Sequence, residues 1–504
     1  MSIATVYSRA QTGMHAPLVS VEVHLSNGLP NFSIVGLPET AVRESKDRVR
    51  AAIINSNFEF PARRITVNLA PAELPKQGGR FDLPIALGLL IASKQLSENL
   101  IQDYEFLGEL SLSGELRKTT GILPAAHACQ IIGSKLITSI ENKKELIPIN
   151  HKTYFCASHL LDVCAHLNDI KQLINEPDEK FNQQDLAQSP MCDVYGQKRA
   201  KRALCIAAAG QHHVLMIGSP GSGKSMLASR FSSLLSPLNE TEMLETCSVY
   251  SIANVSGQQR HPQSRPFRSP HHTVSSVGLA GGGSNPQPGE ISLAHNGVLF
   301  LDEFTEFDRH ALEILREPLE TGMITISRAA AQVEFPARFQ LIAAMNPCSA
   351  GCDIDEYGQC ECSAEQLKRY RNKISAPLLD RIDIQISVPK LPTQLLLSST
   401  NNKNENWDEI KNRINNARNS QLQRQGKLNS FLTGNEIQEL CCLTEQTQTE
   451  FINMLEKINI SARAFHRILK VARTIADLEQ SAAVEKQHLT EAISYRQLDR
   501  LLKS

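Results

Sequence analysis

The stretch that most constrains the fold of this chain is residues 212–231, where a short apolar run, a glycine-rich turn and a helical pattern follow one another. The apolar run Val214–Ile217 has the length of a buried strand and ends directly at Gly218. Beyond the turn, Leu227 and Phe231 recur at helical spacing. A strand, a tight turn and a helix in this order are typical of layered α/β proteins, so the sequence predicts an α/β fold around this stretch.

The turn itself matches the phosphate-binding pattern G-x-x-x-x-G-K-[ST], in the strand and helix context that the pattern requires. Its residues are Gly218, Ser219, Pro220, Gly221, Ser222, Gly223, Lys224 and Ser225. Glycines let successive backbone N–H groups point at phosphate oxygens, and the following helix adds its positive end. We expect Lys224 to meet the β- and γ-phosphates of ATP and Ser225 to bind Mg²⁺. The alternative is a chance glycine and serine turn before a helix.

Two acidic residues farther along the chain complete this chemistry. Residues 297–301 form a continuous apolar run that ends in Asp302 and Glu303, and a central parallel strand presents acids at its carboxyl end in this way. We expect Asp302 to hold the magnesium shell and Glu303 to polarise the attacking water as a general base. Together with Lys224, the two acids indicate ATP hydrolysis rather than nucleotide storage alone.

The composition limits what can surround such a site. A chain of 504 residues predicts two to four domains, and 41% hydrophobic and 21% charged residues are ordinary for a globular protein. Because the formal net charge is -1, any binding of nucleic acid must come from local basic patches. Twelve cysteines without an even framework indicate reduced thiols. The longest apolar run, residues 83–92, is too short to cross a bilayer, so we expect a cytoplasmic protein without a membrane partner.

Changes in pattern along the chain predict three domains and a linker. Residues 1–167 alternate strand-like and helical segments and form an α/β front domain. Residues 168–190 are polar with almost no apolar periodicity, which is typical of a linker. Residues 191–390 hold the phosphate loop and a predicted parallel sheet, and residues 391–504 have helical signals and few strand signals. The predicted class is therefore an α/β multidomain protein with a helical carboxy-terminal domain.

A group of four cysteines follows the third apolar run of the predicted core. Cys348, Cys352, Cys360 and Cys362 lie in the short polar stretch CSAGCDIDEYGQCEC, which suggests a tetrahedral zinc site that orders the loop. Structural cysteines without metal are the alternative, because the spacing is not a C-x-x-C pair. The cations of residues 368–373 follow on a predicted helix, as a solvated face or as a contact for nucleic acid.

Several further segments resemble parts of AAA+ ATPases. In that class, a segment such as Val194, Gly196 and Gln197 lies over the adenine, although here it could simply begin a helix. The apolar run 339–345 ends in Asn346, which the resemblance assigns as the polar sensor near the γ-phosphate.

The resemblance also assigns two arginines. The segment PLLDRID, residues 377–383, resembles the one that carries a trans-acting arginine in the magnesium-chelatase and replicative-helicase branch. Arg381 would then act on the nucleotide of a neighbour, which implies a ring, unless it only pairs with a nearby aspartate. Residues 461–469 resemble the second-sensor helix of the lid. Arg463 is the expected phosphate contact there, and Arg467 is its competitor one helical turn away.

The chain between Lys224 and Asp302 is longer than one helix and one strand require. The surplus includes the stretch RPFRSPHH and three glycines, which are turn-rich and not expected in a core. A later segment, 316–328, predicts a helix end followed by a hairpin arm. In the same branch such insertions project into the channel of the ring, so Arg268 and Arg328 are candidate contacts to a DNA backbone. His271 and His272 are expected to be solvated or channel residues, with metal binding the less favoured alternative.

The front domain carries its own resemblance. The stretches KQGGRFDLPIALGLLIAS and GELSLSGELRKTTGILPAAHAC resemble the peptidase domain of Lon-type proteases, which implies a small α/β fold of the ribosomal-protein S5 type. Lon chemistry needs a serine nucleophile and a lysine base, but the matching places read Phe81-Asp82-Leu83 and Gly121-Ile122-Leu123. We therefore expect a non-proteolytic domain. Recruitment of another serine such as Ser93 is the alternative.

Taken in order, these motifs resemble the YifB/ComM family of magnesium-chelatase-like AAA+ ATPases over nearly the whole chain. The blocks that carry the resemblance are RPFRSPHHT, GEISLAHNGVLFLDE, LEILREPLETGMITISRA, AAMNPC, PLLDRID and SARAFHRILKVARTIADL. The resemblance implies a homo-hexameric motor that uses ATP and Mg²⁺ to move branched DNA during natural transformation, with a recombinase as a possible partner. The alternatives are a chelatase-type motor subunit, a protein remodeller without protease activity and an ATP-dependent protease. In one departure, Ala350 stands where the family commonly has a second cysteine, with Cys352 as the substitute.

Overall fold

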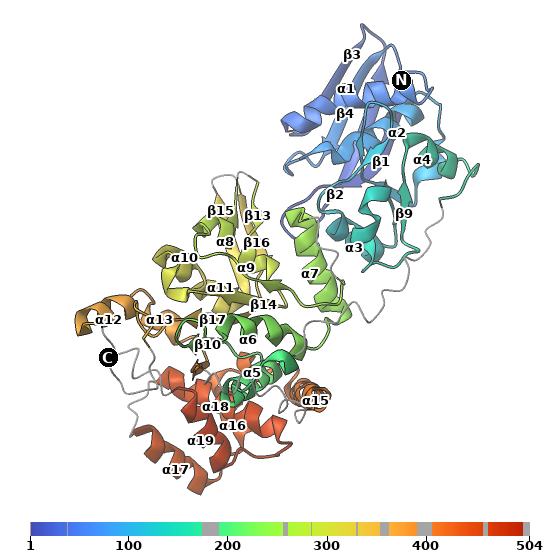
Figure 1. Ribbon diagram of the computed structural model, residues 1–504. Helices are drawn as coiled ribbons and strands as arrows, with labels where there is room; N and C mark the ends of the chain where they lie inside the picture. Colours follow the sequence, from blue (N-terminus) through green and yellow to red (C-terminus); the bar gives the residue numbers. More distant parts are fainter. Residues whose placement is uncertain are drawn as a thin grey trace.

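The computed structural model describes residues 2–37, 39–173, 191–255, 261–283, 285–328, 331–352, 362–390, 406–456 and 462–496. Figure 1 shows the chain arranged in three successive parts, with the front domain at one end, the sheet that carries the phosphate loop in the middle and a group of helices at the other end. The predicted class, an α/β multidomain protein with a parallel-sheet core and a helical carboxy-terminal region, is confirmed. The exact domain boundaries stay predictions, and most of the predicted linker lies outside the described residues.

The front domain is built on a seven-stranded mixed sheet of order β3-β4-β2-β1-β5-β8-β9. Its strands are β1 Ser2–Arg9, β2 Leu18–Ser26, β3 Asn31–Val35, β4 Arg64–Ala70, β5 Tyr104–Phe106, β8 Lys135–Ser139 and β9 Tyr154–Ala157. In β2 every second side chain is buried, as the alternating sequence predicted. Helix α2 (Asp82–Ala92) contacts β1, β2 and helix α1 (Thr40–Asn55), and all its residues are buried. The apolar run 83–92 is therefore a core helix.

The middle part is a five-stranded parallel sheet of order β11-β14-β17-β10-β18. Its strands are β10 Val214–Ile217, β11 Phe267–Arg268, β14 Val298–Leu301, β17 Gln340–Met345 and β18 Ile384–Ser387. Strands β10, β14 and β17 are buried throughout, because helices cover parallel sheets on both faces. Since parallel strands end at one edge, the residues that follow β10, β14 and β17 meet there.

Strand β11 corrects the sequence interpretation of the stretch RPFRSPHH. That stretch was expected to be a turn-rich insertion outside the core, but Phe267 and Arg268 form the edge strand and pair with β14. The ring of Phe267 stacks on that of Phe300 at 6.0 Å between centroids. A strand of two residues is too short to show alternation, which is why the proline-rich sequence concealed it.

The predicted hairpin arm is confirmed. Helix α11 (Arg316–Thr321) ends at Gly322, and β15 (Met323–Arg328) then pairs with β16 (Ala331–Pro336) in antiparallel register. A second, short hairpin joins β12 (Gly281–Gly282) to β13 (Gln287–Pro288). A Cβ atom on Gly281 would lie 2.8 Å from the Ile326 side chain, so the two hairpins pack tightly together.

Helices make up the described part of the carboxy-terminal region. They are α15 Trp407–Gln425, α16 Gly434–Cys441, α17 Glu445–Glu456, α18 Ala462–Leu478 and α19 Lys486–Ser494. Helix α18 packs against α5 (Lys198–Gly210), the helix that precedes the phosphate-loop strand. In the described part of the chain, no helix has the length and apolar character needed to cross a membrane.

The remaining helices surround the two sheets. They are α3 Ile122–Ile132, α4 Leu160–Leu167, α6 Lys224–Phe231, α7 Glu240–Ala253, α8 Ser276–Ala280, α9 Glu290–Leu293, α10 Arg309–Ile314, α12 Ala364–Arg371 and α13 Ala376–Leu379. Figure 1 shows α7 reaching from the middle part to α3 of the front domain. At this contact the backbone N–H of Gly121 donates to the carbonyl of Ser251 at 2.9 Å, and the Ser251 hydroxyl donates to Glu145 at 2.8 Å. The front domain is thus attached to the helix that follows the phosphate-loop helix.

Candidate active site

The phosphate loop lies between β10 and α6, as the sequence predicted. Gly221 and Gly223 adopt φ values of 78° and 94°, which favour glycine over residues with a Cβ. A Cβ atom on Gly218 would lie 2.2 Å from the carbonyl oxygen of Val388, so a larger residue would collide with the backbone beyond β18. These glycines are required by backbone geometry, independently of any ligand.

Lys224 begins α6, and its side chain folds back over the loop. Its Nζ donates to the carbonyl oxygens of Gly218 at 2.7 Å and of Ser219 at 2.9 Å. The residue is only 8% exposed. Burial lowers the pKa of its ammonium group, and the charge of Asp302 opposes that shift. The lysine is thus held among the backbone groups that the motif assigns to phosphate binding.

Ser225 near the start of α6 lies next to Asp302, which directly follows β14. The Ser225 Oγ donates to Asp302 Oδ2 at 2.5 Å, and the other carboxylate oxygen accepts from the Glu303 backbone N–H at 2.9 Å. A hydroxyl and a carboxylate are hard oxygen donors of the kind that Mg²⁺ prefers. The pair therefore fits the metal that the sequence predicted, and Ser225 and Asp302 are the residues that would hold it.

Glu303 has a partner that the sequence reasoning missed. Its Oε2 lies 3.0 Å from Nδ1 of His272, and Glu303 itself adopts φ 50°. His272 was expected to be a solvated or channel residue; its side chain is 31% exposed, and it also contacts the candidate general base. The rings of His271 and His272 lie 4.1 Å apart between centroids. Because β11 runs beside β14, the residues that follow β11 reach the same edge as Glu303.

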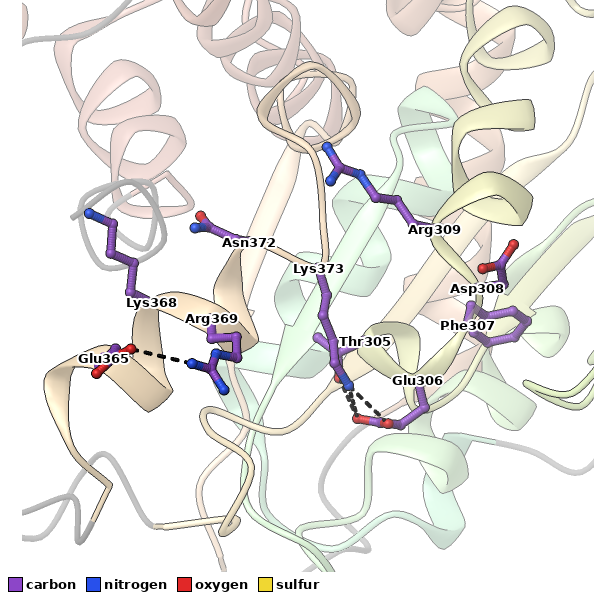
Figure 2. Close-up of a pocket in the computed structure, with 10 residues that line it drawn as sticks. All are labelled: Thr305, Glu306, Phe307, Asp308, Arg309, Glu365, Lys368, Arg369, Asn372 and Lys373. Carbon is purple, nitrogen blue, oxygen red and sulfur yellow. Dashed lines mark hydrogen bonds and ion pairs between the residues drawn. The ribbon is translucent and has the colours of Figure 1, made fainter.

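Asn346 follows β17 and completes the group. Its Oδ1 accepts from Lys224 Nζ at 3.3 Å. Its backbone carbonyl accepts from the Tyr370 hydroxyl at 3.2 Å, and that hydroxyl accepts in turn from Thr305 Oγ1 at 2.7 Å. Figure 2 shows the neighbouring ion pair of Lys373 with Glu306. Helix α12 is thus tied both to Asn346 and to the segment that follows Glu303.

The segment expected over the adenine lies beside the phosphate loop. Val194 is buried with 4% of its surface exposed. Gly196 and Gln197 both have positive φ, and the Gln197 Nε2 donates to the carbonyl oxygens of Ser222 at 3.3 Å and Pro389 at 2.6 Å. Gln197 therefore fixes this segment to the loop, and the assignment of Val194, Gly196 and Gln197 to the adenine stays a prediction.

Arg381 and Arg463 line one pocket of about 210 Å³, and the phosphate-loop residues are not part of its lining. Arg381 donates to the carbonyl oxygen of Pro377 and to the carboxylate of Glu320, and burial lowers the pKa of its guanidinium while Glu320 opposes the shift. Among the described residues no ion pair within 4.0 Å engages the exposed Arg463. The structure thus gathers the two assigned arginines at a second site on the chain.

Arg467, the competitor of Arg463, lines the same pocket and is also bonded to groups outside α18. It donates to Asp383 at 2.5 Å and to the backbone carbonyl of Arg381 at 2.9 Å. Burial alone would raise the pKa of Asp383. The charge of Arg467 and the hydrogen bond from His212 outweigh burial and hold this pKa well below its usual value. Arg467 therefore fastens α18 to the segment that carries Arg381.

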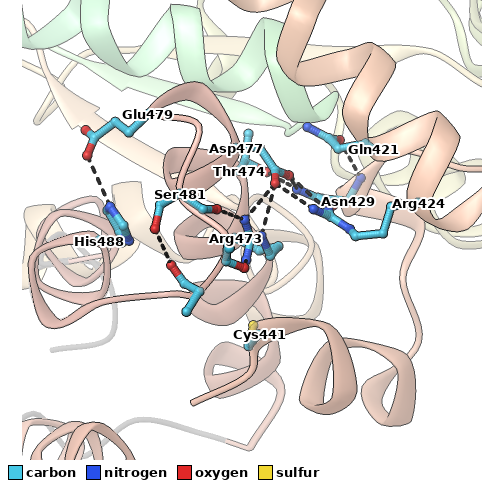
Figure 3. Close-up of polar contacts among 12 residues, drawn as sticks. Gln421, Arg424, Asn429, Cys441, Arg473, Thr474, Asp477, Glu479, Ser481 and His488 are labelled. Atoms are coloured by element: carbon cyan, nitrogen blue, oxygen red, sulfur yellow. Dashed lines mark hydrogen bonds and ion pairs between the residues drawn. The ribbon is translucent and has the colours of Figure 1, made fainter. Parts of the chain in front are cut away.

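A buried polar network extends this attachment into the lid. His212 Nε2 lies 2.7 Å from Thr474 Oγ1, to which Asn429 Nδ2 donates at 3.0 Å. Asn429 also donates to Asp477, which accepts from Arg424 and Arg473 as well (Figure 3). A buried carboxylate is stable only when it is paired in this way. The start of the phosphate-loop strand is thus linked to the lid through satisfied buried groups.

The two arginines expected to contact DNA have different surroundings. Arg268 forms a bidentate ion pair with Glu290, with distances of 2.7 Å and 2.6 Å. The expectation that it projects from an insertion is therefore wrong, because its strand belongs to the sheet and its guanidinium is engaged. Arg328 is the last residue of β15, and its side chain lies outside the described part of the structure.

Three of the four predicted zinc ligands come together. The Sγ atoms of Cys348, Cys352 and Cys362 all lie within 4.8 Å of one another, and Cys360 lies outside the described residues. The backbone N–H of Cys352 points at Cys348 Sγ at 3.2 Å. A Cβ atom on Gly351 would lie 2.9 Å from Pro220, so this loop packs on the phosphate loop. The thiol geometry fits a soft-ligand metal such as Zn²⁺.

The Lon-like position in the front domain holds a buried carboxylate. Asp82 accepts from Arg48 Nε at 2.7 Å and from the Leu110 backbone N–H at 3.2 Å. An aspartate paired with an arginine cannot act as the serine of a serine–lysine dyad. Ser93, the alternative nucleophile, donates to the carbonyl oxygen of Leu89 at 2.8 Å within its own helix.

Together, the loop, the acids and the amide at one edge of a parallel sheet, beside a helical region, define a protein of the AAA+ ATPase class. Family models agree in all three parts: "Subunit ChlI of Mg-chelatase" matches residues 21–142, "Magnesium chelatase, subunit ChlI" matches residues 190–396 and "Magnesium chelatase, subunit ChlI C-terminal" matches residues 404–496.

Full-length relatives narrow this class to one family. The chain is 48% identical over 502 residues to YifB of Salmonella typhimurium, covering 100% of this chain and 98% of the relative. It is 47% identical over 509 residues to the competence protein ComM of Haemophilus influenzae, covering 100% and 99%. The chain therefore belongs to the YifB/ComM family of magnesium-chelatase-like AAA+ ATPases. The chain is 22% identical over 242 residues to the magnesium-chelatase subunit ChlI-1 of Arabidopsis thaliana, covering 43% of this chain and 55% of the relative.

Proposed function

We propose that this protein is an ATP-hydrolysing motor that works as a hexameric ring and moves branched DNA during recombination, as in natural transformation. The observation that carries the ring is the separation of two sets of groups on one chain. Lys224, Asp302 and Asn346 meet at the phosphate loop, whereas Arg381 and Arg463 line another pocket. Arginines that act on a nucleotide from outside its own site require a neighbouring subunit.

The residues of the site have distinct tasks in this proposal. Lys224 and the loop N–H groups bind the β- and γ-phosphates, and Ser225 with Asp302 holds Mg²⁺, which neutralises charge on the phosphates. Glu303 accepts the proton of the attacking water, and His272 orients that carboxylate. Asn346 keeps Lys224 aligned from the neighbouring strand. Arg381 and Arg463 stabilise the charge that develops on the neighbour's γ-phosphate.

Two features support DNA as the substrate that is moved. The packed hairpins β12–β13 and β15–β16 are the insertions that the family resemblance directs into the channel of the ring. A relative that is 47% identical over its whole length is named a competence protein. A chelatase-type motor subunit is the alternative, and it is weaker because the ChlI-1 similarity covers only 43% of this chain.

The proposal predicts ATP-dependent movement of a labelled three- or four-way DNA junction by the wild-type protein. Lys224→Ala should abolish this movement, because the substitution removes the cation that binds the transferred phosphate. Strand exchange is followed on a native gel, with Arg199→Ala, a charge-matched change on an exposed face of α5, as the control. Wild-type protein that leaves the junction intact with ATP, or a Lys224→Ala variant as active as wild type, would contradict the proposed function.

We also propose that the cysteine cluster binds one Zn²⁺ and that this metal orders the loop packed on Pro220. The three described thiols lie close together, and the N–H of Cys352 can stabilise a thiolate on Cys348. Cys360 would supply the fourth ligand. Because Gly351 contacts Pro220, loss of the metal should also weaken ATP binding.

Metal analysis of purified protein should therefore give about one Zn²⁺ per chain, as expected for a closed four-thiolate site. Cys348→Ser and Cys362→Ser should lose the metal, and a chelator should lower the affinity for a fluorescent ATP analogue severalfold. Cys442→Ser provides the matched control, because Cys442 is exposed on the lid outside the cluster. Equal zinc content in all three variants would exclude the cluster as the site.

A further inference from the structure

A second cavity, of about 650 Å³, lies between α12 and the segment that follows Glu303. We call it the α12 cavity. Four exposed cations line it: Arg309, Lys368, Arg369 and Lys373. Figure 2 shows Lys368 and Asn372 extending from the α12 side and Arg309 reaching from α10 on the other, with Lys373 between them. Cations thus approach the cavity from two separate elements.

The carboxylates of the lining neutralise only part of this charge. Lys373 pairs with Glu306 at 3.1 Å, and Arg369 pairs with Glu365 at 3.3 Å. Across the described part of the chain, no ion pair within 4.0 Å joins Arg309 or Lys368 to a carboxylate, including Asp308 in the lining. Among the described residues, the cavity therefore presents two cations that form no ion pair within 4.0 Å, although the charge of Glu313 on α10 acts on Arg309, together with the amide of Asn372.

We propose that the α12 cavity binds the phosphodiester backbone of the DNA on which the motor acts, an inference that rests on the proposed function. Arginine, lysine and amide groups are the donors that bind phosphate oxygens. The aromatic residue of the lining, Phe307, is only 4% exposed, so the cavity offers no open ring on which a base could stack. Binding here is independent of base sequence.

The walls of the cavity connect this site to the catalytic groups. The backbone N–H of Glu306 donates to the carbonyl oxygen of Glu303 at 2.7 Å. Thr305, which also lines the cavity, reaches the carbonyl of Asn346 through the Tyr370 hydroxyl. A phosphate that binds Lys373 would break its ion pair with Glu306, and Glu306 belongs to the segment that directly follows the candidate general base, Glu303. Occupation of the cavity thus favours DNA-stimulated ATP hydrolysis.

The test is a salt titration of DNA binding by full-length protein, with a fluorescently labelled single-stranded oligonucleotide and a non-hydrolysable ATP analogue. Arg309→Ala combined with Lys368→Ala should weaken binding about tenfold or more at low salt. It should also reduce the slope of log affinity against log salt by about 1.4, since each phosphate contact to a single strand contributes about 0.7. Arg43→Ala combined with Lys46→Ala removes the same charge from α1 of the front domain and should keep the wild-type slope.

A charge-keeping exchange, Arg309→Lys with Lys368→Arg, should retain most of the slope, which separates lost charge from misfolding. If the alanine pair and the α1 control have the same slope while wild-type protein binds, the inference is overturned and the proposed function stands. Wild-type protein that binds no oligonucleotide at any salt concentration would overturn both.

Discussion

Glu303→Gln is expected to lower the rate of ATP hydrolysis by about 100-fold or more, because a positioned general base contributes roughly 10²- to 10⁴-fold. The amide cannot accept the proton of the attacking water, although it keeps the shape of the side chain. ATP binding should remain, since Lys224, Ser225 and Asp302 are untouched. Phosphate release and binding of a fluorescent ATP analogue, measured on the same preparation, separate the two effects.

The matched control for this variant is Glu240→Gln, which removes an exposed carboxylate at the start of α7. It should hydrolyse ATP like the wild type. His272→Ala gives a graded comparison, because Glu303 would keep its carboxylate and lose its orienting partner. If Glu303→Gln hydrolysed ATP at the wild-type rate, Glu303 could not be the general base.

Mixed rings are expected to distinguish arginines that act on a neighbour from arginines that act within their own subunit. The Arg381→Ala variant alone should hydrolyse ATP about 10³-fold or more slowly than the wild type, which is the effect typical of losing an arginine finger. A Lys224→Ala subunit has no working site but keeps its arginines. Mixing it with an equal amount of Arg381→Ala subunits should restore about a quarter of the wild-type rate per chain, if subunits assort randomly around the ring.

The same experiment decides the role of Arg463. Because Arg463 and Arg381 line one pocket, we expect Arg463→Ala to be rescued by Lys224→Ala subunits in the same way. An arginine that served its own subunit's nucleotide would show no rescue, since neither partner would then have a complete site. Failure of rescue for Arg381→Ala itself would remove the neighbour-acting arginine from the proposed function.

The parts of the site that follow fully buried strands could be predicted from the sequence. Strands β10, β14 and β17 are continuous apolar runs, so the residues after them, Lys224, Asp302 and Asn346, could be assigned to one edge of a parallel sheet. The structure brings these three side chains together. Each of these strands can be recognised from its own residues, because a strand that is buried on both faces of a sheet is a continuous run of apolar residues.

Pairings between distant segments could not be predicted. Nothing near His272 indicates Glu303 as its partner, because the contact depends on the two-residue strand β11. Helical spacing placed Arg463 and Arg467 on one face, and both line the pocket that holds Arg381, but the pairing of Arg467 with Asp383, which directly precedes β18, could not be predicted. Such contacts are fixed by the register of neighbouring elements, and a single sequence does not display that register.

The attachment of the front domain at Ser251 has a consequence for the covalent chain. Hydrogen bonds from Gly121 and Leu123 meet Ser251, and Leu244 and Cys247 of α7 pack against the apolar cluster beneath α3. These contacts join residues on either side of segment 174–190 without using it. From these contacts we expect the two pieces to remain associated after a cut within that segment, so that the front domain stays bound to its own ATPase core.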